Sequence, residues 1–137
     1  MASTPVFTST PIIGTARLTA ANTARDGSGT IVPLLTGATN GTRVDRITFI
    51  SAQATAAAQA AMVGRVFISD TGNTIFRLYI ELLLPTITPS NTVIGQRQQA
   101  VFLGGLNLQS GMVLYCTKSV HGGVADQFDV IAEGGHF

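Results

Sequence analysis

The feature that most limits the fold of this chain is the regular interruption of its apolar runs. Short runs rich in β-branched, aromatic and aliphatic residues alternate with clusters of Gly, Asn, Asp and Pro. Such runs are typical of strands, and the clusters hold the residues that form tight turns. The runs cover residues 13–20, 30–35, 43–50, 62–69, 74–84, 96–103, 112–118 and 127–133. The pattern predicts an all-β fold, a single domain of about eight short strands that form a sandwich or a barrel.

Several runs carry finer predictions. The alternation in residues 74–84 places one set of side chains on each face of a strand, with Leu78, Ile80 and Leu82 facing one way and Arg77, Tyr79 and Glu81 the other. The sequence Asp-Thr-Gly-Asn at residues 70–73 predicts a hairpin turn. The glycine pairs at 104–105 and 134–135 predict the ends of the sixth and eighth strands.

Two segments fall outside this pattern. Residues 1–11 form a predicted extended arm, because Pro5 and Pro11 bracket Ser and Thr and favour extended backbone. The sandwich domain is then expected to span residues 12–137. Residues 52–61 are rich in alanine and fit either a loop with strand extensions or a helical turn. The N-terminus has no basic region followed by an apolar core, so we expect synthesis in the cytoplasm without a secretory leader.

The low charge of the chain bears on what it contacts. Charged residues make up only 11% of the sequence, against about 25% in typical soluble domains. A surface of Thr, Ser, Asn, Gln, Gly and Ala suits packing against other protein, since interface cores are also poor in charge. The alternative is a monomeric domain that is simply rich in threonine. The net charge is +1 and the arginines are dispersed, so we expect no nucleic-acid partner.

The sequence offers no pattern typical of an enzyme. Cys116, His121 and Asp126 lie close in sequence but match no metal-ligand spacing. Ser119, with the same His and Asp, lacks the Gly-x-Ser-x-Gly context of a hydrolase nucleophile. We therefore expect no catalytic residue, cofactor, metal or small-molecule substrate, and a buried, unreactive Cys116. The apolar stretch 75–84 is too short to cross a bilayer, so no membrane partner is expected.

Two charged groups are candidates for an interface. Arg25 and Asp26 lie in a glycine-flanked loop, where the Asp can bind backbone amides and the Arg can reach a carboxylate in the same or another subunit. Arg43 and Asp45 lie two residues apart on one strand face and can pair with each other or with neighbouring strands. The alternative for both is an ordinary exposed ion pair.

Several segments together resemble a group of small virion proteins of tailed bacteriophages. They are residues 22–29 (NTARDGSG), 41–47 (GTRVDRI), 62–68 (MVGRVFI) and 130–135 (VIAEGG), and the resemblance covers about residues 16–135. It implies a single-domain antiparallel β-sandwich that is jelly-roll-like. It also implies a capsid decoration, or cement, protein on the virion surface, commonly a homotrimer bound to the major capsid protein. It brings no catalytic residues. The arm, with Pro5, Phe7 and Pro11, could then lie along a capsid subunit or exchange between protomers.

Two other functions fit the same sequence. One is a phage tail or head–tail connector component, which would form a hexameric ring rather than a trimer. The other is a carbohydrate- or receptor-binding β-sandwich, which would need exposed aromatic rings to stack on sugars. The chain has no Trp and only two Tyr, Tyr79 and Tyr115, which disfavours the last function.

Overall fold

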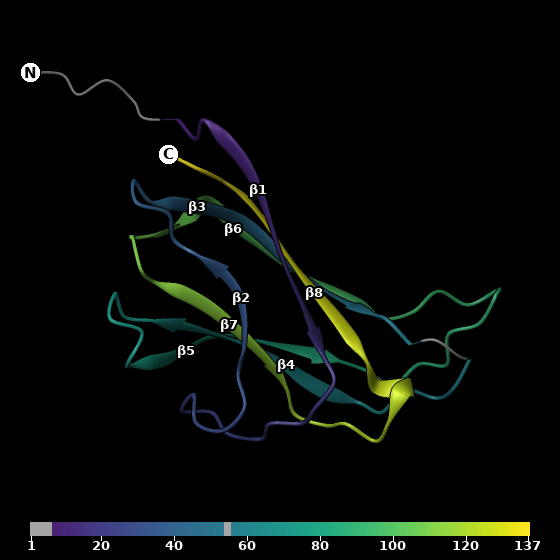
Figure 1. The fold of residues 1–137 in the computed structure, drawn as a ribbon. Coiled ribbons are helices and arrows are strands. Elements are labelled where there is room, and N and C mark those ends of the chain that lie inside the picture. The colour runs from purple at the N-terminus through teal and green to yellow at the C-terminus, as the bar shows by residue number, and fades with distance from the viewer. Residues whose placement is uncertain (1–6, 54–55) are drawn as a thin grey trace, which may run out of the picture.

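The computed structural model describes residues 7–53 and 56–137. They form two four-stranded antiparallel sheets packed face to face, which confirms the predicted all-β sandwich (Figure 1). The strands are β1 (Thr10–Leu18), β2 (Val32–Thr36), β3 (Thr42–Ser51), β4 (Met62–Ser69), β5 (Phe76–Leu84), β6 (Arg97–Leu108), β7 (Val113–Lys118) and β8 (Phe128–His136). One 3-10 turn, η1 (Val124–Asp126), precedes β8.

The strand order is that of a jelly roll. One sheet has the order β1-β8-β3-β6 and the other β2-β7-β4-β5; we call them the 1-8-3-6 and the 2-7-4-5 sheet. The chain pairs β1 with β8, β2 with β7, β3 with β6 and β4 with β5, as one long antiparallel ribbon with the β4–β5 hairpin at its tip. The ribbon is rolled up, so that β3 also pairs with β8 and β4 with β7.

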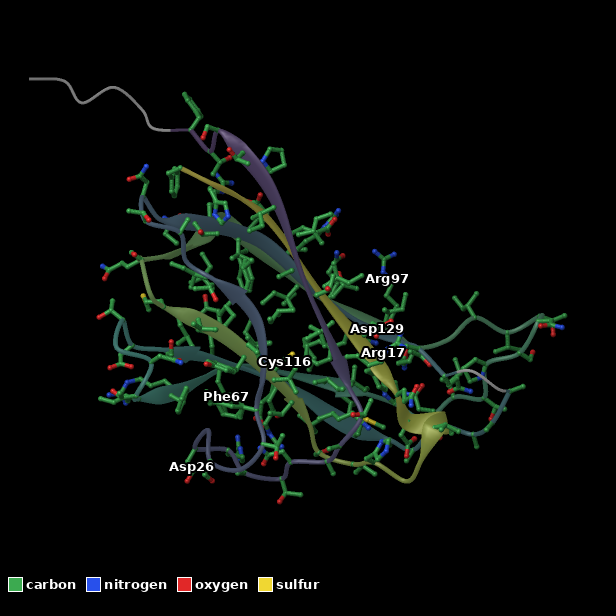
Figure 2. All side chains as sticks on the ribbon, in the orientation of Figure 1. Arg17, Asp26, Phe67, Arg97, Cys116 and Asp129 are labelled. Atoms are coloured by element: carbon green, nitrogen blue, oxygen red, sulfur yellow. The ribbon has the colours of Figure 1, made fainter. Side chains whose placement is uncertain are left out.

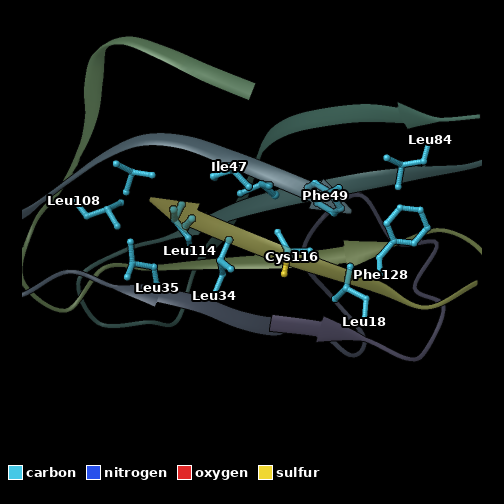
Figure 3. Packing of buried hydrophobic residues seen from close by; sticks show 14 of the residues in the cluster. Leu18, Leu34, Leu35, Ile47, Phe49, Leu84, Leu108, Leu114, Cys116 and Phe128 are labelled. Carbon is cyan, nitrogen blue, oxygen red and sulfur yellow. The ribbon is translucent and has the colours of Figure 1, made fainter. Parts of the chain in front are cut away.

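The core lies between the two sheets and is almost entirely apolar. Its largest buried side chains include Phe49, Phe128, Ile47 and Leu114, which come from both sheets (Figure 3). Full burial of each such side chain stabilises the fold by roughly 1.5–3 kcal/mol. Cys116 lies in the same layer, and burial raises the pKa of its thiol to about 12. The predicted burial of this cysteine is confirmed, and its raised pKa keeps the thiol protonated at neutral pH.

The two lateral sides of the sandwich differ. On one side β1 lies close to β2, because Gly14 has no side chain to separate it from the backbone of Leu34. On the other side β5 and β6 are free edges, and each contains a bulge. The bulged residues are Tyr79 in β5 and residues 102–105 in β6, where Gly104 and Gly105 have φ angles of 83° and 81°. Bulges of this kind hinder further strand pairing at an edge.

The ends of several strands differ from the sequence prediction, and the differences in β1, β6 and β8 bear on the fold. β1 begins at Thr10, and Pro11 pairs with Gly135, so the sandwich starts two residues before the expected boundary at residue 12. The glycine pair 104–105 does not end β6, which continues through the bulge to Leu108. Nor does the pair at 134–135 end β8, which continues to His136 between β1 and β3. At 104–105 glycine permits the left-handed backbone of the bulge, and at 134–135 it permits the close approach of a neighbouring strand. Neither glycine pair ends its strand.

The predicted alternation of β5 is wrong at its middle. Leu78 lies opposite Phe67, and Ile80 lies opposite Val66, so Tyr79 is an extra residue without a partner in β4. Because neighbouring residues of β4 point to opposite faces, Leu78 and Ile80 do so as well. Ile80 packs against the core, whereas Leu78 lies on the outer face beside Phe67. A one-residue bulge thus reverses the faces along half of the strand.

The alanine-rich segment contains no helix in its described residues, 52–53 and 56–61. Gln59 forms an isolated bridge with Ile87, and the hydroxyl of Thr86 donates a hydrogen bond of 2.6 Å to its carbonyl. The described part is therefore a loop with a short strand-like contact. Residues 54 and 55 lie outside the described residues.

Candidate interaction surfaces

Charged side chains on this protein are mostly neutralised within the chain. Residues 7–53 and 56–137 contain five ion pairs: Arg17–Asp129, Arg25–Glu81, Arg43–Asp45, Arg46–Glu133 and Arg65–Glu81. Among the described residues, only Arg77 and Arg97 are charged, exposed and without a side-chain ion pair or hydrogen bond. The surface is therefore even less charged than the composition suggests.

The outer face of the 1-8-3-6 sheet carries two of these pairs across its strands. Arg17 of β1 donates to Asp129 of β8 at 2.7 Å and 2.9 Å, with both residues on one side of the molecule in Figure 2. Arg46 of β3 makes the same two-pronged contact with Glu133 of β8. Hydrogen bonds from these guanidinium groups lower the pKa of both carboxylates. The pairs therefore stabilise the face at neutral pH, and their contribution is lost as the pH falls through the lowered carboxylate pKa values.

Apolar side chains lie beside these pairs on the same face. Ile13 lies two strands away from Arg46 in the register of β1, β8 and β3, and Val101 lies directly opposite Arg46 on β6. Their side chains are 66% and 63% exposed. A face that combines paired charges with exposed aliphatic groups resembles the mixed surface of protein–protein interfaces.

A different loop covers the outer face of the 2-7-4-5 sheet. Asn22 holds residues 22–30 together, because its side chain binds the carbonyls of Ser28 and Thr30 and the amide of Ala24. The loop is attached to the sheet by Arg25, which donates to Glu81 at 2.7 Å. Glu81 also accepts from the nearly buried Arg65 at 2.8 Å, and Arg65 in turn donates to the Asn22 carbonyl.

Glu81 is therefore the residue on which attachment of this loop depends. Replacing Glu81 with Gln is expected to lower the melting temperature by a few degrees and to speed proteolysis within residues 22–30, because it leaves the buried Arg65 without a countercharge. The control is Asp129→Asn, which removes the partner of the well-exposed Arg17 and should change melting much less. Equal effects of the two substitutions would contradict this role.

The bulged side of the sandwich exposes several large apolar side chains. Leu103, on the β6 bulge, is 98% exposed, and Val101 lies just before the bulge. Tyr79 of the β5 bulge lies beside Phe102, with ring centroids 5.8 Å apart. Because the two bulges come from different sheets, they join the free edges of both sheets into one apolar patch.

A buried polar cluster surrounds Lys118 at the end of β7. The Nζ of Lys118, the only lysine, donates to the carbonyls of Val120 at 3.0 Å and Asp126 at 2.5 Å and lies 2.8 Å from Nδ1 of His121. The Asp126 carboxylate accepts from the amides of Ala60 and Gly122. Burial lowers the pKa of Lys118 to about 8, although the nearby Asp126 opposes the shift. The cluster ties the 119–127 loop and residue 60 to β7.

The four charged interface candidates predicted from the sequence all have partners within the chain. Arg25 reaches Glu81 of its own chain, and Asp26 accepts hydrogen bonds from the amide and hydroxyl of Ser28, on the loop shown in Figure 2. Arg43 and Asp45 pair with each other at 2.7 Å. The charged groups of these four residues therefore all have hydrogen-bond partners within one subunit. The Arg25–Asp26 pair and the Arg43–Asp45 pair do not contact each other.

The remaining candidates lie at the start of the chain. Phe7 is 80% exposed just before β1, and Pro11 lies in β1 opposite Gly135. Pro5 lies outside the described residues. Sequence reasoning missed Val101, Leu103 and the bulged position of Tyr79. The available signal was the Gly104–Gly105 pair directly after an apolar run, because glycine inside a strand often marks a bulge.

Among the described residues, no group of three His, Cys, Asp or Glu side chains could hold a metal ion. No helix in the described part of the chain is long and apolar enough to cross a membrane. No protein-family model matches the sequence, and no curated protein matches it significantly.

Proposed function

We propose that the protein is a structural component of a tailed-phage virion, a decoration or cement protein. It binds the outside of the capsid and clamps neighbouring copies of the major capsid protein. The observation that carries the proposal is a surface with few charges, most of them ion-paired within the chain, combined with exposed Ile13, Val101 and Leu103. A surface of this kind gains by contact with other protein surfaces. The jelly-roll fold and the sequence resemblance support the same function.

The clamp would use the outer face of the 1-8-3-6 sheet. That face spans four strands, and a standard stable interface buries about 1,200–2,000 Å² in total. Arg17 and Arg46 are already paired with carboxylates on this face, so burying these pairs against a capsid subunit does not leave their charges without a partner. Repetition of a weak contact over many symmetry-related sites then makes the whole coat stable.

The direct test is to mix the purified protein with undecorated heads of the phage whose genome encodes it. We expect binding at regular positions and a higher temperature of head disruption. A protein that has no affinity for heads contradicts the proposal. A hexameric ring that binds the head vertex or the tail instead would assign it to the connector.

The N-terminal arm is expected to contribute to this binding. Deletion of residues 1–8 leaves the first backbone contact of the sandwich, from the Ser9 amide to the His136 carbonyl at 2.8 Å, and all of β1. The truncated protein should keep its melting temperature but bind heads at least about tenfold more weakly. The measurement is binding to heads across a concentration series, and unchanged affinity contradicts a role for the arm.

A further inference from the structure

The outer face of the 1-8-3-6 sheet carries one positive charge in excess. Residues that lie directly opposite each other on neighbouring strands point to the same face, so the register shows which charges share it. Four arginines and three carboxylates do so: Arg17, Arg43, Arg46, Arg97, Asp45, Asp129 and Glu133. Three of the arginines form ion pairs with the three carboxylates. Arg97 is the fourth, and its charge is the excess.

Arg97 is held apart from the carboxylates of this face. It begins β6, the edge strand, and lies opposite Ile50 of β3, which in turn lies opposite Asp129 of β8. Figure 2 shows Arg97 on the same side of the molecule as Asp129, but Asp129 is bound twice by Arg17. The five N–H donors of the Arg97 guanidinium therefore remain available to a partner.

A hollow on the same face gives a partner side chain a place to enter. Its volume is about 330 Å³, and it is lined by Thr15, Ala16, Arg17, Asp129 and Ile131. Thr15 and Ile131 lie opposite each other, in the outward-facing row next to that of Asp129 and Arg97. Contact here would cover Arg97 together with the apolar groups around it.

Burial of the face affects paired and unpaired charges differently. Arg17 and Arg46 keep their carboxylates, whereas Arg97 loses its water and needs an anion from the partner in its place. A partner that has no anion at this position is disfavoured, so Arg97 contributes to specificity as well as to affinity. A carboxylate suits the planar guanidinium best among protein groups, because it can accept two parallel hydrogen bonds.

A second copy of this chain has no free side-chain carboxylate to offer. The chain has seven Asp and Glu residues, and all lie in the part that the structure describes. Each one accepts hydrogen bonds from side chains or backbone amides of its own chain: Asp26, Asp45, Asp70, Glu81, Asp126, Asp129 and Glu133. The carboxylate that binds Arg97 therefore belongs to a different protein.

We propose that the outer face of the 1-8-3-6 sheet docks on an acidic site of the major capsid protein, where an Asp or Glu binds Arg97 through two hydrogen bonds. Charge complementarity selects this occupant, because the face has one positive charge in excess and the partner supplies the missing negative charge. The inference rests on the proposed function and deepens it by naming the chemistry of the partner site.

The test is binding of the full chain and its variants to undecorated heads across a concentration series. Arg97→Gln should raise the dissociation constant at least about tenfold, and Arg97→Glu should raise it further because it places two negative charges together. Arg97→Lys should restore only part of the affinity, since an ammonium group keeps the charge but not the two parallel hydrogen bonds. Rising salt should weaken binding of the unaltered protein more than binding of Arg97→Gln.

The matched control is Arg77→Glu. Arg77 is the other exposed arginine of the described chain without an ion pair, and it lies on β5 of the opposite sheet. This variant should bind heads as the unaltered protein does. Equal losses for Arg77→Glu and Arg97→Glu overturn the proposal, because they show a general effect of net charge. Circular dichroism of each variant verifies that the fold is intact.

The same experiment separates this inference from the proposed function. An unaltered protein that does not bind heads contradicts the decoration role itself. Heads that bind Arg97→Glu as tightly as the unaltered protein overturn the acidic site and leave the decoration role standing. A substitution at Arg97 that changes the molecular mass of the free protein in sedimentation, with head binding intact, assigns Arg97 to a contact between copies and also overturns the inference.

Discussion

Replacement of Gly134 by alanine is expected to lower the free energy of unfolding by roughly 3 kcal/mol, the upper part of the range for overpacking. Gly134 lies in β8 with β1 on one side and β3 on the other. An added Cβ would overlap the carbonyl of Arg43 and lie 2.9 Å from the Cα of Val44, and both are backbone atoms that no rotamer change can move. The strands of the 1-8-3-6 sheet must separate to admit a methyl group.

Chemical denaturation of Gly134→Ala beside Gly72→Ala measures this effect. Gly72 lies in the exposed β4–β5 turn, and a Cβ there meets no atom closer than 3.5 Å. The control should change stability by no more than about 0.5 kcal/mol. If both variants unfold at the same denaturant concentration, the close approach of β8 and β3 does not limit the fold.

The second large effect is expected at the buried lysine. Lys118→Met keeps the length of the side chain but removes the donor that satisfies the carbonyls of Val120 and Asp126. Each buried acceptor left without a partner costs about 1–3 kcal/mol, and relief of the buried charge offsets part of this. We expect a net loss of roughly 2–4 kcal/mol in the free energy of unfolding, measured by denaturation at pH 7.

The pH dependence identifies the lysine as the cause. Its pKa is about 8 in the folded protein and 10.5 as the ordinary value, so the unfolded chain binds more protons between these limits and stability rises with pH there. Cys116 acts in the opposite direction above pH 9, because its pKa rises from 9.0 to about 12 on folding. The rise between pH 8 and 9 should therefore disappear in Lys118→Met. A variant that keeps this rise contradicts the assignment.

Much of the architecture followed from local sequence. The β4 bounds, the hairpin turn at residues 70–73 and the burial of Cys116 agree with the prediction. For the first two the determining interaction is local: β-branched runs favour extended backbone, and the Asp70 carboxylate binds the amides of Thr74 and Ile75. The interaction surface was less predictable. Arg25 and Arg43 were candidates for contact with another subunit, but each pairs with a carboxylate of its own chain.

The sequence by itself determined that this chain forms strands, about how many, and that few ionised groups reach its surface. Only the tertiary structure decided which strands pair, and hence where Leu103 projects and which face Leu78 takes. The physical reason is that a bulge is defined by two strands together: the extra residue exists only relative to a partner far away in sequence. From the sequence, Gly104 and Gly134 both predicted the end of a strand. In the structure, Gly104 lies in the open bulge and Gly134 lies in β8 between two other strands.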